Sequence, residues 1–347
     1  MNYLLILKAK MQKFYGRFEV YITPTLKFLL ALVAFSCINS KLSFMPILTR
    51  PAVVVIGALL CSFLPVNTVV IFSALAILAH CFKASVYIAL VVAVFFILLL
   101  LLYFRFSPKD VLAVILTPIC FTLKIPYVMP IAVGLTGTPA SAIGVGVGVM
   151  VYYVVDYVAS AADSIQTVME YSNDSILIVV AYLIDGVVAN APMIVCAIAF
   201  AATVIVVYVI RMLSINYSWI FAMVAGALTN LLILFIGDLK LVTNVSIGGA
   251  FLGNLIAIAL CFILQFFVFN VDYNRTEHVQ FEDDEYYYYV KAVPKVVVKP
   301  RDITAEQKAA RAAAKQHRRG ASSKPAAGDS DYAEEDEEEV RVYSRKK

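Results

Sequence analysis

Long apolar runs separated by short polar segments occupy the first 270 residues of the chain. A helix needs about 20 apolar residues to cross the hydrocarbon core of a bilayer, because each residue adds about 1.5 Å along the axis. The clearest runs predict membrane spans at Ser85–Phe104, Ala142–Val158, Ala191–Val209, Ser218–Ile236 and Ser246–Asn270. Shorter runs predict further helices at Leu26–Cys37, Pro51–Leu64 and Val69–Cys81.

Prolines interrupt one apolar stretch, Val111–Leu135. Pro118, Pro126 and Pro130 each remove a backbone donor and disfavour helix at the preceding residue. Irregular backbone at membrane depth survives only where protein or a watery cavity covers it. The stretch is therefore either a re-entrant hairpin or broken helix, of the kind that lines substrate paths in transporters, or a proline-kinked helix pair held by packing.

Small residues recur at spacings of three and four in two of the predicted spans. They leave one face of a helix without bulky side chains, so that a neighbouring backbone can approach closely. These residues are Gly137, Ser141, Gly144 and Gly148, followed by Gly249 and Gly253 in the last span. We expect them to serve helix packing.

The distribution of Lys and Arg between short loops predicts the orientation of the spans. Basic residues mark the N-terminal amphipathic segment 1–24, the loop of Arg105 and Lys109, and the loop of Arg211 as cytoplasmic. The segment 163–174 contains three acids and no base, which suits the outside. Segment 1–24 lacks the features of a cleavable signal, so we expect the first span to act as an uncleaved anchor.

One scheme agrees with these charges and leaves both termini in the cytoplasm of a bacterial cell, with the body in the cell membrane. It has eight crossings, and Val111–Leu135 enters and leaves on the same side. Lys41 and Arg50 fall in an outside loop of this scheme and argue against it. The count therefore ranges from seven to nine. The predicted fold is an all-α polytopic membrane protein of about eight transmembrane helices, with a proline-broken re-entrant hairpin and a short, partly β/α charged cytoplasmic tail.

Composition supports this division into a membrane body and a tail. Hydrophobic residues make up 62% of the chain, against about 45–50% in soluble domains. Only 13 of the 28 Lys and Arg residues and 8 of the 24 Asp and Glu residues lie within the first 271 residues. We expect a transmembrane domain at 25–270 and a water-exposed tail beyond it.

The predicted tail has three parts. Segment 271–300 is Tyr-rich and strand-like, segment 301–319 is a basic helix, and segment 320–347 is disordered and acidic. The acids and tyrosines of the first part form a candidate surface for a cytoplasmic protein. They are Glu282, Asp283, Asp284, Glu285, Tyr286, Tyr287, Tyr288 and Tyr289.

Polar residues at membrane depth are the other candidates, because an unpaired charge there costs a few kcal/mol or more. Lys124 lies at the turn of the proline-rich stretch, and a pair with Asp156 or Asp185 would mark a polar pocket. Together with Pro126 and Pro130, these residues are the predicted substrate path. The alternative places both aspartates at the outer interface and lets Lys124 extend to the membrane surface.

The chain contains no motif for catalysis, and we expect no enzyme, no metal and no cofactor. All six cysteines lie in apolar stretches without metal-binding spacing. P-loop, GxSxG and HExxH sequences are absent. The net charge of +4 includes a nearly neutral tail, so we expect no nucleic-acid partner. The expected partners are the lipid bilayer and a cytoplasmic protein, with a homo-oligomer as a further option.

The segment FVFNVDYNRTEHVQFEDDEYYYYVKAVPK, with RFSPKD and the KIPYVMP and GTPASA sequences, resembles an uncharacterised multi-spanning membrane-protein family of Gram-positive anaerobes. Its members are loosely labelled ABC transporter permeases. The resemblance extends from about Phe104 to Val298, and Glu282–Tyr289 is its most specific part. It implies no substrate or mechanism, and the chain lacks an EAA-like loop that would couple to an ATPase.

Two functions remain. The first, slightly favoured by the sequence, is a non-enzymatic scaffold or assembly factor that recruits a cytoplasmic partner through its tail. The second is a permease or channel-like subunit with a path along the proline-rich stretch. A polar cavity that reaches this stretch would favour the second.

Overall fold

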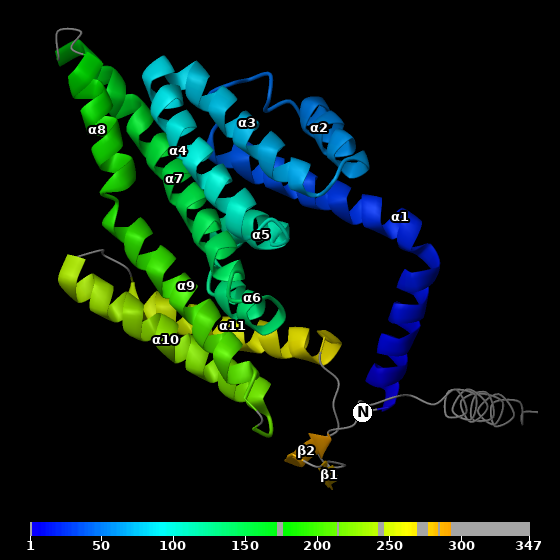
Figure 1. The fold of residues 1–347 in the computed structure, drawn as a ribbon. Helices are drawn as coiled ribbons and strands as arrows, with labels where there is room; N and C mark the ends of the chain where they lie inside the picture. Colours follow the sequence, from blue (N-terminus) through cyan, green and yellow to red (C-terminus); the bar gives the residue numbers. More distant parts are fainter. Residues whose placement is uncertain are drawn as a thin grey trace, which may run out of the picture. The chain divides into compact units, whose positions relative to one another are not determined.

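The computed structural model describes residues 2–171, 176–213, 215–241, 246–268, 277–283 and 285–292. The chain divides into two compact units, residues 11–296 and a smaller unit of residues 1–10 with 297–347. The first helices are α1 (Asn2–Lys41), α2 (Pro51–Phe63), α3 (Asn67–Ala84), α4 (Val86–Phe106), α5 (Val111–Thr122) and α6 (Val128–Thr136), labelled in Figure 1. They are followed by α7 (Ser141–Tyr171), α8 (Ile176–Val188), α9 (Ala191–Arg211), α10 (Ser218–Leu241), α11 (Ile247–Val268), β1 (Glu277–Glu282) and β2 (Tyr287–Ala292).

Seven helical segments of the described ranges are long and apolar enough to cross a membrane. They are Lys13–Lys41, Asn67–Ala84, Val86–Phe106, Ser141–Ala162, Val180–Arg211, Ser218–Leu241 and Ile247–Val268. Helices α2 and α5 are apolar but shorter. The predicted all-α class is thus confirmed, and the helices suit a membrane protein by length and composition.

Large apolar side chains lie exposed along these helices. Phe63, Leu101 and Leu232 have exposed fractions of 81%, 63% and 59%. Similar side chains recur along the outer faces of α4, α10 and α11. A fold in water would bury such surfaces, whereas lipid covers them at no cost. The exposed faces therefore support lipid as the surrounding solvent.

Helix α7 is longer than its predicted span, Ala142–Val158. The sequence from Met150 to Tyr171 contains neither glycine nor proline, so nothing ends the helix when its residues become polar. The next helix, α8, escaped prediction because Asp185 and Gly186 interrupt its apolar run. Asn190 then separates α8 from α9 and caps α9, since its Oδ1 accepts a hydrogen bond from the Met193 backbone at 3.1 Å.

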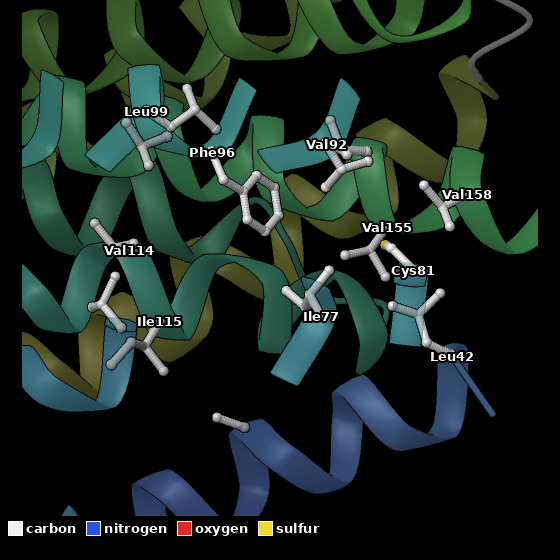
Figure 2. Packing of buried hydrophobic residues seen from close by; sticks show 14 of the residues in the cluster. Leu42, Ile77, Cys81, Val92, Phe96, Leu99, Val114, Ile115, Val155 and Val158 are labelled. Atoms are coloured by element: carbon white, nitrogen blue, oxygen red, sulfur yellow. The ribbon is translucent and has the colours of Figure 1, made fainter. Parts of the chain in front are cut away.

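Buried side chains of α1, α3, α4, α5 and α7 form an apolar cluster. Figure 2 shows Ile77, Phe96, Val114 and Val155 turned toward one another inside it. Other residues of α7 pack against α9 in a second cluster. A third cluster joins α6 with α10 and α11. Helix α7 therefore links the two groups of helices that enclose the α5–α6 segment.

Candidate functional site

The proline-rich stretch folds as two short helices joined by a sharp turn at Lys124. Lys124 adopts a left-handed backbone with φ of 61°. Its N–H donates to the Phe121 carbonyl at 3.0 Å, and the N–H of Ile125 donates to the Cys120 carbonyl at 2.9 Å. This pair of bonds is a Schellman motif, which ends α5 and satisfies two of its last carbonyls.

Two of the three prolines occupy positions where their missing N–H group is tolerated. Pro126 lies in the turn, and Pro130 lies in the first turn of α6, where no intrahelical donor is needed. Pro118 lies inside α5, where it removes one intrahelical hydrogen bond to the carbonyl four residues earlier. The Thr122 hydroxyl donates to the carbonyl of Pro118 itself at 3.0 Å. The stretch thus consists of two short helices joined by a turn, which we call the α5–α6 hairpin.

Both ends of the α5–α6 hairpin meet the first turns of α7. A Cβ atom on Gly144 would lie 3.3 Å from the Cβ of Asp110, and one on Gly148 would lie 2.6 Å from the Cβ of Thr117. The backbone N–H of Thr138 donates to the Ser141 hydroxyl at 3.0 Å. The hairpin thus begins and ends at the same end of α7, and glycines allow its close approach.

Arg211 binds the C-terminal end of α6, where the α5–α6 hairpin leads into α7. From the last turn of α9, its guanidinium donates to the carbonyl of Leu135 and, at 2.7 Å, to that of Gly137. It also lies over the Tyr208 ring, 4.9 Å from the centroid. The sequence predicted Arg211 only as a cytoplasmic charge. Its structural role depends on a contact across 76 positions, which no local pattern reveals.

Aromatic rings surround the turn of the hairpin. Phe121 stacks on Tyr152 of α7, with centroids 4.4 Å apart and an interplanar angle of 18°. It also stacks on Phe200 of α9 at 5.7 Å, and Tyr127 meets the same ring edge-on at 6.0 Å. A Cβ on Gly253 of α11 would lie 2.5 Å from the Tyr127 ring, so glycine makes room for this tyrosine.

Gly137 and Gly249 differ from these glycines in their surroundings. A Cβ on Gly137 would meet the nearby Ser141 hydroxyl at 2.6 Å, whereas Gly249 faces only Ser246 of its own segment at 3.2 Å. Of the predicted packing glycines, Gly144, Gly148 and Gly253 are therefore those that face another helix.

A cavity of about 90 Å³ lies between α1, α3, α4, α5 and α7. Most of its wall is apolar, formed by side chains such as Ala74, Ile77, Phe96, Ile115, Pro118 and Val151. Ser73 lies in the same wall, and its buried hydroxyl makes no hydrogen bond within the part of the chain that the structure describes. The cavity therefore reaches the proline-rich hairpin, as a transport path would require, but it is not predominantly polar.

Polar side chains mark the two ends of this cavity. Tyr103 lies near the start of α5, because its hydroxyl donates to the Pro108 carbonyl at 3.3 Å. Lys41 and Tyr152 line the cavity near the end of α5, where Tyr152 stacks on Phe121. Lys41 Nζ is 2.6 Å from Asp156 Oδ1 and 5.5 Å from the centroid of the Tyr152 ring.

The ion pair at this end differs from the predicted ones. Asp156 binds Lys41 of α1, whereas Lys124 and Asp185 are both exposed, on the hairpin turn and on α8. Lys124 follows the last turn of α5, and its left-handed conformation serves the turn. No local pattern indicates the observed pair, because 115 positions separate Lys41 from Asp156.

The predicted partner-binding segment forms the turn of the β1–β2 hairpin. Asp283 accepts hydrogen bonds from the backbone of Glu285 and Tyr286 and from the hydroxyl of Tyr288. Strands β1 and β2 both lie within segment 271–300, which the sequence predicts to be strand-like. Asp284, the basic helix 301–319 and the acidic segment 320–347 lie outside the described residues.

No group of three or more His, Cys, Asp or Glu residues that would hold a metal ion occurs within the described ranges. A scan against protein-family models and searches of curated proteins and of solved structures found no match to this chain. The resemblance to the uncharacterised membrane-protein family therefore stays a prediction, and the function must be inferred from the geometry alone.

Proposed function

We propose that this protein is a permease-like membrane protein that holds a small amphiphilic molecule in the cavity beside the α5–α6 hairpin. The observation that carries the proposal is the cavity itself, which has an apolar wall from five helices and ends at Lys41 and Tyr152, with Asp156 bound to Lys41. Its wall includes Pro118, in the only hairpin of two short helices within the described ranges.

The chemistry of the wall indicates the class of ligand. A molecule that enters from lipid gains little from apolar burial, because acyl chains are as apolar as the wall. Selectivity must then come from shape and from polar atoms. The Ser73 hydroxyl lacks a hydrogen-bond partner in the described structure, and the Lys41 ammonium and Tyr152 hydroxyl lie at the cavity end. A ligand with an apolar body and an oxygen-rich end satisfies both requirements.

We propose that the chain crosses the membrane eight times and that the α5–α6 hairpin is re-entrant. Helix α2 runs back along α1, since Ser62 donates to the Pro24 carbonyl at 2.9 Å and Lys27 donates to the Leu64 carbonyl at 3.2 Å. A short α2 crossing brings the count to eight. The Lys41–Asp156 pair neutralises one of the two basic residues that opposed this scheme. Both termini then lie in the cytoplasm.

A photoreactive short-chain carboxylic acid, small enough for a cavity of about 90 Å³ and carrying a diazirine and an alkyne, tests ligand binding in the purified full-length protein. Ala74→Phe fills the cavity wall, and Val94→Phe adds the same group on the exposed face of α4. We expect Ala74→Phe to lose labelling of cavity peptides and Val94→Phe to keep it. Equal labelling of both variants would contradict the proposal. A cavity label that an excess of the same acid without the reactive groups does not displace would also contradict it, because such labelling is not specific binding.

The scaffold function is the second candidate, and the exposed Tyr287 and Tyr289 beside the acidic turn favour it. It predicts that a stoichiometric cytoplasmic protein co-purifies in mild detergent. Deletion from Glu282 onward would remove this protein, whereas Ala74→Phe would retain it. A purified sample without such a protein would contradict the scaffold function and leave the permease function as the remaining candidate.

A further inference from the structure

The β1–β2 hairpin has two chemically different faces. In its antiparallel register, Val279 pairs with Val290 and Phe281 pairs with Tyr288, whereas Gln280 pairs with Tyr289 and Glu282 pairs with Tyr287. Because side chains alternate along a strand, the first two pairs share one face and the other two share the opposite face. We call the first set, Val279, Phe281, Tyr288 and Val290, the apolar face.

The apolar face is organised but uncovered. The Phe281 and Tyr288 rings are stacked, with centroids 5.0 Å apart and an interplanar angle of 20°. All four side chains of the face are nevertheless exposed, at 38–51%. An isolated two-stranded hairpin is marginally stable in water, and it needs packing against a further surface. The face therefore requires an occupant.

The connection to α11 limits where that occupant can be. Helix α11 has 22 residues, so it spans about 33 Å at 1.5 Å per residue, which matches the hydrocarbon core. Its end at Val268 then lies at the membrane surface. Nine steps of chain lead from Val268 to Glu277, which reach at most about 30 Å. The hairpin cannot move far from the bilayer.

The composition of the apolar face favours lipid, and not a protein surface, as its occupant. The four side chains of the apolar face carry no charge, and their only polar group is the Tyr288 hydroxyl, which is bound to Asp283 at 2.9 Å. Glu282 lies on the other face, whereas the register places Glu277 on the same side as Val279, at the end of β1 that follows α11. Tyrosine and other aromatic residues favour the headgroup region, where an apolar ring and a polar hydroxyl are both solvated.

We propose that the hairpin rests on the bilayer with its apolar face, and that Val279, Phe281, Tyr288 and Val290 insert into the headgroup–acyl boundary beside α11. Tyr287 and Tyr289 then face the water. This inference rests on α11 being a membrane span and is independent of the cavity and its ligand.

Tryptophan fluorescence of the full-length protein in nanodiscs tests the proposal. Phe281→Trp places the probe on the apolar face, and Tyr289→Trp places it on the opposite face of the same hairpin. Each variant is reconstituted into phosphatidylcholine with and without bromine atoms on the acyl chains, which quench nearby indoles. Trp219 is the single native tryptophan, so wild-type protein supplies its contribution.

We expect the added emission of Phe281→Trp to be blue-shifted and to be largely lost in brominated lipid, while that of Tyr289→Trp is retained. Val290→Trp repeats the measurement on the other strand in case Phe281→Trp disturbs the hairpin. Unquenched but blue-shifted emission from both apolar-face variants would assign the face to a protein surface and overturn the proposal. Equal quenching on the two faces would also overturn it.

Discussion

Alanine at two glycines of α7 tests the contact that positions the α5–α6 hairpin. A Cβ on Gly148 would lie 2.6 Å from the Thr117 Cβ and 3.0 Å from the Val114 carbonyl oxygen. Carbon atoms prefer about 3.5–4.0 Å, so α5 must shift by about 1 Å. Gly146 lies on the same helix, and a Cβ there would meet nothing within 4 Å.

The magnitudes predict opposite signs for the two variants. Alanine gains about 0.8–1 kcal/mol over glycine within a helix, and Gly146→Ala should keep this gain. Overpacking at Gly148 costs about 1–3 kcal/mol, which cancels or exceeds the same gain. Gly148→Ala should therefore be less stable than Gly146→Ala by the cost of overpacking.

Thermal unfolding in one detergent, followed by size-exclusion chromatography of the remaining folded protein, measures this difference. We expect the Tm of Gly146→Ala to rise above that of the wild type and the Tm of Gly148→Ala to fall below that of Gly146→Ala. If both variants gain the same stability, α5 does not pack against this face of α7, and the described hairpin geometry is wrong.

Three further predictions concern individual side chains. Arg211→Gln removes the charge that binds two hairpin carbonyls, so we expect a loss of about 2–3 kcal/mol in the same thermal assay, with exposed Arg50→Gln as the neutral control. Asp156→Asn removes the carboxylate that neutralises Lys41 and competes with an anionic ligand for its ammonium, so we expect stronger labelling by the short-chain acid probe at an unchanged fold, whereas Asp185→Asn should label like the wild type. Hydrogen bonds from the Glu285 backbone, the Tyr288 hydroxyl and the Tyr286 backbone lower the pKa of Asp283 below its usual 3.8. The hydrogen bonds therefore stabilise the folded hairpin fully above pH 3.8, and this stabilisation is lost as the pH falls through the lower folded-state pKa of Asp283. Hydrogen exchange at the β-turn should accelerate only in that pH range. Asp283→Asn should abolish this acceleration.

The helices were predictable because each carries its signal within its own segment. Helices α4, α9, α10 and α11 each carry a long, predominantly apolar run, and the structure begins each of them within one residue of the predicted start. The break at Lys124 was predictable for the same reason, since the prolines around it exclude a continuous helix. Local chemistry therefore accounts for most of the architecture.

The candidate site was less predictable, because its contacts join distant segments. Nothing near Lys41 in the sequence indicates Asp156, and nothing near Arg211 indicates the carbonyls of Leu135 and Gly137. The sequence offered a pair of Lys124 with Asp156 or Asp185 as one of two alternatives, and in the structure Asp156 pairs with Lys41 instead. Spacing along the chain cannot decide which of several basic residues reaches a given carboxylate, whereas helix packing does.

The topology of the α5–α6 hairpin can be measured directly by labelling single cysteines in a variant without native cysteines. Lys109→Cys and Thr138→Cys flank the hairpin, and Lys83→Cys lies at the opposite end of α4. A membrane-impermeant maleimide, applied to intact cells and to inverted vesicles, reports the side of each position. We predict that Lys109→Cys and Thr138→Cys react from the cytoplasmic side and Lys83→Cys from the outside. Reaction of Lys109→Cys and Thr138→Cys from opposite sides would show that residues 111–136 cross the membrane, which contradicts the re-entrant hairpin.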